Sequence, residues 1–427
     1  GPAGMFCALT LCEFGYKPVV LERGADMDRR IAAVEGYWHG GVLDRSSNVQ
    51  FGEGGAGTFS DGKLTTRIND PLCSRVLERL AEFGAPEEIL TQAKPHIGTD
   101  RLRSVVRNLR KRVISLGGEV RFLTPLEGVE LRSGRLESIR INGADSPCGA
   151  LALAVGHSAH DTFRMLRESG VELVPKPFSV GARIEHLQTD IDLALYGKYA
   201  GHPALPPAEY QLSYHEGGRG VYTFCMCPGG YVVASASEPG TVVTNGMSYF
   251  DRAGRNANSA VLVSVSPEDF GGGPLGGAEF IQRLEQQAFQ MGRSGKAPAA
   301  LTREFIAGGS SFTLGRVEPT YSLGVEPADL NRLFPEYVST PLKNGLRYFD
   351  RRIPGFSDSD SVLTAIETRS SSPVRLPRNE SGFAECADNL FPCGEGCGYA
   401  GGIMSAAVDG IKTAVRIMEK YSPDSGE

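Results

Sequence analysis

Small residues at the start of the chain are suited to binding a phosphate group. Residues 1–4, Gly-Pro-Ala-Gly, directly precede an apolar helical pattern, and a strand-like run then ends at Glu22 and Arg23. Turn, helix, strand and acid in this order form the second half of the G-x-G-x-x-G unit that binds dinucleotides. The helix N-terminus would direct free N–H groups at a pyrophosphate, and Glu22 would accept hydrogen bonds from the ribose hydroxyls. The alternative is a structural helix cap beside a surface glutamate.

A second group of candidate ligand contacts lies at residues 50–64, where five glycines occur between positions 52 and 62. Three of these glycines match G-x-G-x-x-G, but no apolar strand precedes them, so we do not predict a second dinucleotide-binding turn. We interpret the segment as a loop against a cofactor, with Thr58, Ser60 and Lys63 donating to phosphate or flavin atoms. A flexible surface loop is the alternative.

An acidic residue and a glycine-rich helix start occur together near the C-terminus. A strand-like run at 389–393 leads to Glu395, and a segment with several glycines precedes an apolar helical pattern at 403–420. In flavoproteins, an acid in this position accepts a hydrogen bond from the ribityl chain, and the helix N-terminus faces the pyrimidine edge of the flavin. A nicotinamide-binding fold needs no such segment, so the sequence favours FAD over NAD as the bound dinucleotide.

Three side chains are candidates for catalysis. Cys225 and Cys227 could form a thiol site that faces the flavin. Alternate residues of a strand seldom have disulfide geometry, however, and packing of buried free cysteines is the competing interpretation. Arg369 could anchor an anionic substrate or the flavin edge, and a structural ion pair with Glu367 is the alternative. The sequence has no Cys-x-x-Cys or His-x-x-x-His pair, so no metal site is predicted.

The elements that position these residues alternate between helical and strand-like patterns. After the second glycine group come a helical pattern, a small β-meander and a buried strand that ends at Gly156. Between 175 and 354 the pattern changes to strands typical of an antiparallel sheet. We therefore predict an α/β fold in which a discontinuous Rossmann-like FAD-binding domain, residues 1–174 and 355–427, lacks its first strand. An inserted, largely antiparallel α+β substrate domain would cover residues 175–354.

The composition limits the class of protein. The 427 residues carry a formal net charge of −6, and no apolar run approaches the ~20 residues that span a bilayer. An acidic chain disfavours nucleic acid as a partner, and the basic stretch at 101–112 is interpreted as the solvated face of a helix. Nine cysteines at irregular positions are typical of a reducing compartment. We therefore predict a cytoplasmic protein with a small-molecule substrate and no membrane partner.

Taken together, these segments resemble the uncharacterised family of FAD-dependent dehydrogenases in the glutathione-reductase-like flavoprotein superfamily. The matching segments are 1–4, 21–24, 47–64, 154–158, 224–230, 245–248, 367–369 and 394–402. Two features depart from the family pattern. The first strand and its leading glycine are absent, which indicates a fragment of a longer protein, and His160 stands where the family has arginine. The resemblance implies that FAD is bound by Gly1, Pro2, Ala3, Gly4, Glu22, Arg23, Gly54, Gly55, Gly57, Thr58, Ser60, Lys63, Gly156, Gly394, Glu395, Tyr399, Ala400, Gly401, Gly402 and Ile403.

The predicted function is that of an FAD-dependent oxidoreductase, which transfers hydride between the flavin and an unidentified organic substrate. NAD(P)H is a candidate electron donor. Two alternatives stay open. A flavin-dependent RNA-modifying protein would need a basic groove on the inserted domain, and a non-catalytic flavoprotein would hold FAD that no physiological donor reduces. All three interpretations require that Glu22 and Glu395 share one cleft.

Overall fold

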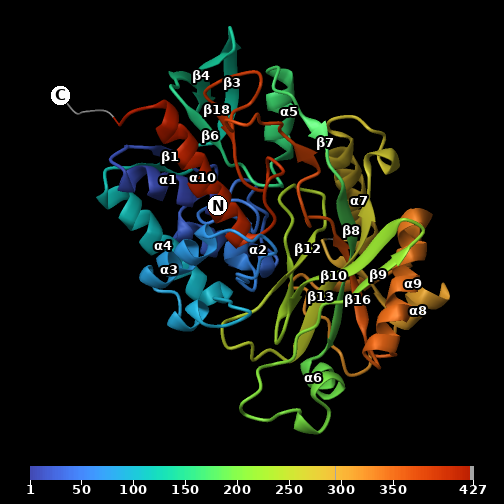
Figure 1. Cartoon of the computed structure of the whole chain (residues 1–427). Coiled ribbons are helices and arrows are strands. Elements are labelled where there is room, and N and C mark those ends of the chain that lie inside the picture. The colour runs from blue at the N-terminus through green and yellow to red at the C-terminus, as the bar shows by residue number, and fades with distance from the viewer. Residues whose placement is uncertain (294, 424–427) are drawn as a thin grey trace.

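Two helices from opposite ends of the chain lie side by side in one half of the molecule (Figure 1). Helix α1 (Pro2–Glu13) packs along helix α10 (Ile403–Lys420), and α10 has the bounds expected from its apolar periodicity. Gly410 permits this close packing, because a Cβ at that position would lie 2.1 Å from the carbonyl oxygen of Ala3. The first and last helices therefore form one layer.

Short parallel strand pairs accompany these helices, as expected for a Rossmann-like unit. In the computed structural model, which describes residues 1–293 and 295–423, β1 (Val19–Leu21) pairs with β2 (Glu119–Arg121). In the same way, β6 (Leu151–Leu153) pairs with β18 (Leu390–Pro392). Because parallel strands end at the same edge, the segments that follow β6 and β18 leave the sheet on one side.

Helices and a small meander complete this half. Leu102, Val105 and Leu109 recur at helical spacing and are buried on the inner side of α4, which explains why this highly charged segment is a helix against α1. The strands β3, β4 and β5 form the antiparallel meander predicted from their alternating pattern. The bounds are α2 (Met27–Trp38), α3 (Leu72–Glu82), α4 (Thr99–Ser115), β3 (Leu126–Arg132), β4 (Arg135–Ile141), β5 (Ala144–Pro147) and α5 (His160–Glu168).

A seven-stranded sheet forms the other half, in the order β15-β14-β16-β8-β13-β10-β9. All neighbouring strands are antiparallel except β14 and β15. This confirms a mixed α/β protein with a large, mainly antiparallel sheet. The bounds are β8 (Phe178–Leu187), β9 (Ser213–Glu216), β10 (Arg219–Cys227), β13 (Asn256–Val265), β14 (Ala297–Leu301), β15 (Val325–Pro327) and β16 (Val362–Glu367).

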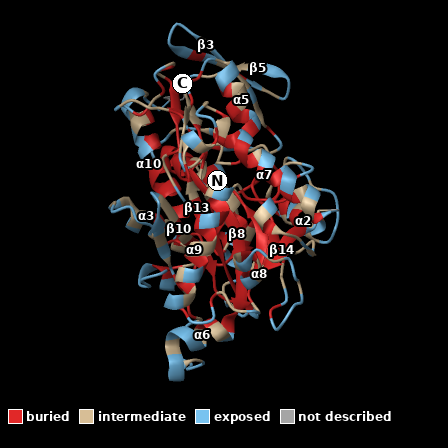
Figure 2. Ribbon diagram, turned by 90° about the vertical axis from the view of Figure 1, so that its right-hand side faces the viewer, coloured by how far each residue is buried: buried red, intermediate tan, exposed pale blue. Residues whose placement is uncertain are grey.

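The centre of this sheet is buried on both faces. Every residue of β8 is buried, and Figure 2 shows the same for most of β13 beside it. The covering elements are α6 (Gln188–Tyr196), β11 (Tyr231–Ala234), β12 (Thr244–Met247), α7 (Gly276–Gly292), α8 (Thr302–Ala307) and α9 (Glu336–Arg352). None of the helices within the described residues is both long and apolar enough to cross a bilayer.

Two details differ from the sequence-based expectations. The sequence also predicts a strand at residues 210–214, but β9 begins only at Ser213, because the Thr223 hydroxyl accepts the Leu212 N–H and interrupts the ladder. In addition, β16 lies beyond residue 354 but pairs with β8, so the large sheet extends into the segment 355–427.

The two halves are joined where the chain crosses between them. At this crossing, β7 (Val174–Pro175) pairs with β17 (Val374–Arg375) in an antiparallel ribbon. One strand leads into the large sheet and the other returns from it, so the two connections lie next to each other.

Candidate functional site

A cavity of about 2090 Å³ contains nearly all of the predicted site residues. This volume exceeds the roughly 300–1,000 Å³ of sites for drug-sized ligands, so the cavity has room for a dinucleotide and a further molecule. The predicted residues that line it are Gly1, Pro2, Ala3, Gly4, Glu22, Arg23, Gly54, Gly55, Gly57, Ser60, Lys63, Gly156, Cys225, Arg369, Glu395, Tyr399, Ala400, Gly401, Gly402 and Ile403. Glu22 and Glu395 therefore share one cleft.

Three predicted residues do not line the cavity. Thr58 and Cys227 are fully buried. Gly394 packs against α1, where a Cβ would come within 2.6 Å of the Ala3 Cβ. Their roles lie in packing the elements that carry the lining residues.

The N-terminus of α1 forms one end of the cavity. This helix has no side-chain cap and no acid in its first turn, so its first N–H groups are available to an anion. The glycine-rich loop, residues 50–64, lies directly against this helix end, because a Cβ on Gly55 would be 2.7 Å from the Cα of Gly1. One carboxylate oxygen of Glu22 accepts the N–H groups of Gly24 at 2.9 Å and Gly52 at 3.1 Å, which fixes the carboxylate beside the helix. This backbone cradle and its acid fit the adenosine and pyrophosphate of FAD.

Arg30 of α2 holds the glycine-rich loop in place, and no sequence motif points to it. Its guanidinium is fully buried and donates to carbonyl oxygens of the loop, at 2.6 to 3.3 Å. Burial lowers the pKa of Arg30 to about 10, so the side chain stays charged at neutral pH. Arg30 lies between Met27 and Val34 on the buried stripe of α2. An arginine at an apolar position of a helix could have indicated from the sequence that this side chain is buried and has specific partners.

Glu395 and the N-terminus of α10 form another part of the lining. Burial raises the pKa of Glu395 to about 7. Within the described residues, its carboxyl group receives a single N–H, from Gly402 at 3.4 Å. Helix α10 also starts without a side-chain cap or an acid in its first turn. An under-bonded acid beside an uncapped helix fits a ribityl hydroxyl and the electron-rich edge of a flavin.

Lys63 contributes positive charge to the cavity. Its ammonium group lies 3.1 Å from one oxygen of Glu209, and Lys94 lies 2.9 Å from the other. Burial raises the pKa of Glu209, but the two lysines outweigh this effect and lower it to about 2. Two ammonium groups and one carboxylate leave a net positive charge here. Ser60 is less available to a ligand, because its hydroxyl donates to the Gly57 carbonyl at 2.6 Å.

His157, which also lines the cavity, has a ring orientation fixed by a chain of hydrogen bonds. The amide nitrogen of Gln50 donates to the Ser235 carbonyl at 3.2 Å, so its amide oxygen must face Ser158. The Ser158 hydroxyl donates to that oxygen at 3.2 Å and can only accept from His157 Nδ1, at 2.8 Å. Burial, reinforced by the nearby Arg369, lowers the pKa of His157 to about 3. The ring is neutral, and its unprotonated Nε2 remains as an acceptor.

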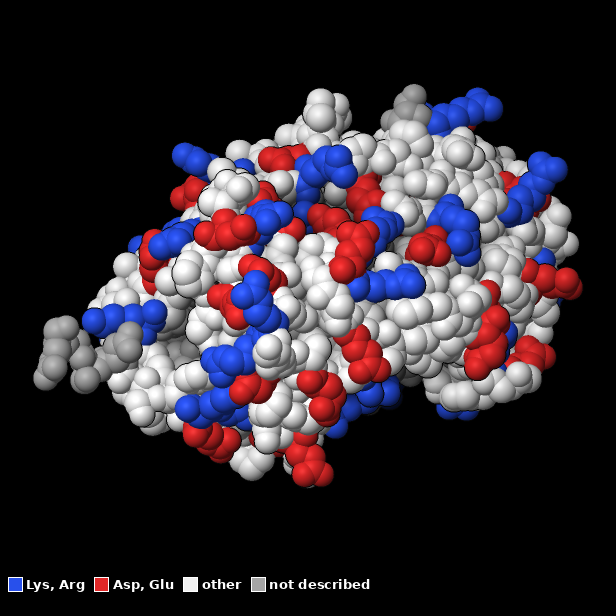
Figure 3. Space-filling model, turned by 90° about the horizontal axis from the view of Figure 1, so that it is seen from above, with Lys and Arg blue, Asp and Glu red and all other residues white. Residues whose placement is uncertain are grey.

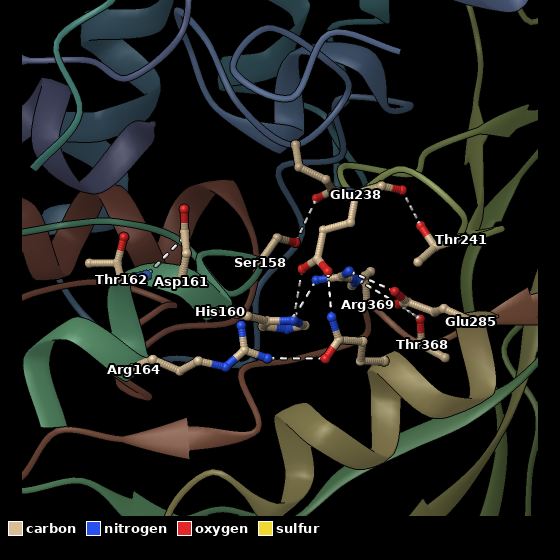
Figure 4. Close-up of polar contacts among 12 residues, drawn as sticks. Ser158, His160, Asp161, Thr162, Arg164, Glu238, Thr241, Glu285, Thr368 and Arg369 are labelled. Carbon is tan, nitrogen blue, oxygen red and sulfur yellow. Dashed lines mark hydrogen bonds and ion pairs between the residues drawn. The ribbon is translucent and has the colours of Figure 1, made fainter. Parts of the chain in front are cut away.

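Arg369 is the centre of a buried polar cluster shown in Figure 4. It forms two parallel hydrogen bonds with Glu285 of α7, both 2.8 Å long, and its third nitrogen lies 3.1 Å from His160 Nε2. The predicted alternative of an ion pair with Glu367 is wrong, because Glu367 is held by Arg183 at 2.7 and 3.0 Å. The arginine thus connects α5 with α7, with few donors left for a ligand.

Cys225 and Cys227 lie at an irregularity of β10. Phe224 is opposite Ala260 and Cys227 is opposite Asn258, so β10 contains one residue more than its partner β13. Cys225 takes up this extra residue with a φ of 44°, in the left-handed region. The regular strand geometry assumed from the sequence is therefore wrong at this pair.

Charged side chains of both signs are interspersed on the face seen in Figure 3. This face of the described chain has no continuous basic stripe of the kind that binds a nucleic-acid backbone.

Comparisons with known proteins agree with the geometry of the cavity. The family described as "FAD-dependent protein, C-terminal domain-like" matches residues 177–370. An uncharacterised protein of Clostridium beijerinckii is 52% identical over 425 residues, which cover 99% of this chain and 80% of that protein.

Solved structures of low similarity were also found. The halogenase PltM is 11% identical with a TM-score of 0.41, covering 98% of this chain and 67% of that chain. A geranylgeranyl bacteriochlorophyll reductase-like protein of Thermoplasma acidophilum is 12% identical with a TM-score of 0.41, covering 99% and 78%. Likenesses at this level support no conclusion about the reaction. The chain belongs to the same family as the Clostridium protein, its residues 177–370 match the FAD-dependent proteins, and FAD is its cofactor.

Proposed function

We propose that this protein is an FAD-dependent oxidoreductase, in which hydride passes between the flavin and a small organic substrate. The observation that carries the proposal is the single cavity that runs from the N-terminus of α1 and Glu22 to Glu395 and the N-terminus of α10. Dehydrogenase chemistry, NAD(P)H as donor and membership of the glutathione-reductase-like superfamily are parts of this proposal. A cytoplasmic location remains a prediction from cysteine usage.

The protein residues would bind and orient the cofactor. The N–H groups of α1 and the adjoining glycine-rich loop would hold the pyrophosphate, and Glu22 would accept from the adenosine ribose. Glu395 would accept from the ribityl chain, and α10 would direct its positive end at the pyrimidine edge. When bound, FAD supplies the capacity to accept or donate hydride. A positive helix end at that edge stabilises the charge that reduction places there.

The rest of the cavity would hold the substrate. It is lined from the large sheet by Tyr222, Phe224 and Cys225, and from the other half by Lys63 and His157. The positive charge at Lys63 favours a substrate with an anionic group, and the free nitrogen of His157 favours one with a hydroxyl or N–H donor. We accordingly propose that the large sheet is the substrate domain, with its second boundary after β16.

Binding of FAD and of FMN separates the roles of the two ends of the cavity. FMN lacks the adenosine half, so FAD should bind far more tightly if α1 and Glu22 recognise that half. Glu22→Ala should weaken FAD binding roughly 10- to 100-fold, the loss expected for hydrogen bonds to a charged group. Glu119→Ala, on the exposed start of neighbouring β2, is the matched control. Flavin fluorescence measures all of these affinities, and equal binding of FAD and FMN would argue against the assigned orientation.

Anaerobic visible spectra test the reaction. The holoprotein should lose its oxidised flavin absorbance when NADH or NADPH is added, and photoreduction with EDTA as the sacrificial electron donor shows that the bound flavin can be reduced. Bleaching by light but by neither nucleotide would contradict NAD(P)H as the donor. If no organic reductant bleached the flavin either, the non-catalytic alternative would replace the proposal.

A further inference from the structure

The irregularity in β10 places two cysteines at the wall of the cavity. Cys225 lines the cavity, whereas Cys227 is fully buried behind it. The Cys227 thiol lies 3.3 Å from the carbonyl oxygen of Cys225 and points back along the strand toward it. In a regular strand the two side chains would stand parallel, but the extra residue at Cys225 breaks that spacing.

A buried cation supports the main chain at the same point. The guanidinium of Arg183 is fully buried, and one of its nitrogens donates to the Cys225 carbonyl at 3.1 Å and to Asn258 Oδ1 at 2.8 Å. Its other two nitrogens donate to the carboxylate of Glu367. This fixed positive charge beside the thiols favours a thiolate. The left-handed conformation of Cys225 is likewise a costly arrangement that the surroundings must maintain.

From this geometry we propose that Cys225 and Cys227 are a redox-active dithiol, a second electron-carrying group in the cavity that holds FAD. Oxidation forms a bond between the two Sγ atoms and releases two electrons and two protons. Oxidised FAD takes up both and becomes reduced FAD, and the reverse step opens the disulfide. The exchange with FAD rests on the proposed function, whereas formation of the disulfide does not.

The acid–base properties of the two thiols match such a pair. The hydrogen bond from Cys227, helped by Arg183 and Lys63, lowers the pKa of Cys225 to about 7, although burial and Asp61 oppose this. The same hydrogen bond raises the pKa of Cys227 well above its usual value. At neutral pH, Cys225 is therefore the accessible nucleophile and Cys227 is the buried thiol that retains its proton.

Peptide mapping tests disulfide formation without any variant. Trypsin releases residues 220–252 as one peptide that contains Cys225, Cys227 and no other cysteine. After treatment of the holoprotein with diamide and then with iodoacetamide in denaturant, this peptide should carry no alkyl group and lack two hydrogen atoms. Prior reduction should restore two alkyl groups. Cys148 and Cys386, which are half-buried and lie in other peptides, should be alkylated under both conditions. Two alkyl groups on the 220–252 peptide after oxidation would overturn the proposal.

Alkylation rates and electron counts test the two roles. At pH 7, iodoacetamide should modify Cys225 at least tenfold faster than Cys148, and Cys227→Ser should remove most of this advantage. In an anaerobic dithionite titration, oxidised wild-type holoprotein should consume four electrons per FAD, and Cys225→Ser and Cys227→Ser should consume two. Equal consumption by wild type and variants would overturn the exchange with FAD. If the protein did not bind FAD, the titration would fail for the wild type and both variants alike. The peptide map would still show whether the disulfide forms.

Discussion

At the residue scale, the hydrogen bonds around His157 predict a single ring tautomer. The chain from the Ser235 carbonyl through Gln50 and Ser158 places the proton on Nδ1 and leaves Nε2 of this cavity-lining residue as an acceptor. A neutral imidazole with a low pKa is a poor proton acceptor at pH 7, so its contribution would be to orient a donor group of the ligand.

NMR of protein labelled with ¹⁵N-histidine checks this prediction. The His157 resonances, assigned by their loss in His157→Gln, should show a protonated Nδ1 and an unprotonated Nε2, unchanged between pH 8 and pH 5. A histidine-containing model peptide, which titrates at about 6.5, provides the control. Ser158→Ala removes the acceptor and should allow the second tautomer. A proton on Nε2 in the wild type, or titration of His157 between pH 8 and pH 5, would contradict the hydrogen-bond assignment.

At the element scale, Arg30 connects α2 with the glycine-rich loop. Arg30→Met would remove the donor from several buried carbonyl oxygens, at a cost of about 2–4 kcal/mol in the free energy of unfolding. The released loop should also weaken FAD binding at least tenfold, because the loop lies directly against the N-terminus of α1.

Denaturant unfolding and flavin fluorescence measure both effects. Arg29→Met is the matched control, since the neighbouring side chain is 74% exposed and has only a 3.7 Å contact with Asp26. The control should leave stability and FAD affinity nearly unchanged. Identical FAD affinities for the two variants would show that the loop keeps its conformation without Arg30.

Periodicity was sufficient to predict several of these elements but not how they meet. The apolar spacing at 403–420 predicts α10, and glycines beside Glu22 and Glu395 indicate two parts of the cavity lining. The irregularity at Cys225 could not be predicted, because it depends on the register between β10 and β13. Glu367, the partner considered for Arg369 as an alternative, is wrong for a similar reason. Glu285 is 84 positions away in sequence, and only the packing of α7 brings it near.

At the scale of the whole molecule, the buried pair of Arg369 and Glu285 lies where α5 meets the large-sheet half. The Glu285 side chain is fully buried and that of Arg369 is 5% exposed, so removing one partner leaves a charge without compensation. Glu285→Leu should therefore lower the free energy of unfolding by about 3–5 kcal/mol. The double variant Glu285→Leu/Arg369→Met should be less destabilised than Glu285→Leu alone.

Denaturant unfolding of the wild type, the single variants Glu285→Leu and Arg369→Met, and the double variant forms a double-mutant cycle. Arg316→Met removes a largely exposed guanidinium that pairs with Asp190 and Asp360; it should cost much less stability than Glu285→Leu and serves as the control. Destabilisation of the double variant by the sum of its single effects would show that the two charges do not act as a pair.

The paired strands β7 and β17 have a consequence for how this architecture can be rearranged. Val174 lies beside Arg375, so the long stretch of chain between them starts and finishes at neighbouring points. A short peptide could therefore replace this stretch, because it would have to span only the small distance between two paired strands. The same adjacency would allow a different domain to be inserted at this ribbon during evolution, while the half that contains α1 and α10 stayed unchanged. Such an exchange would change the substrate of the protein and leave its cofactor unchanged.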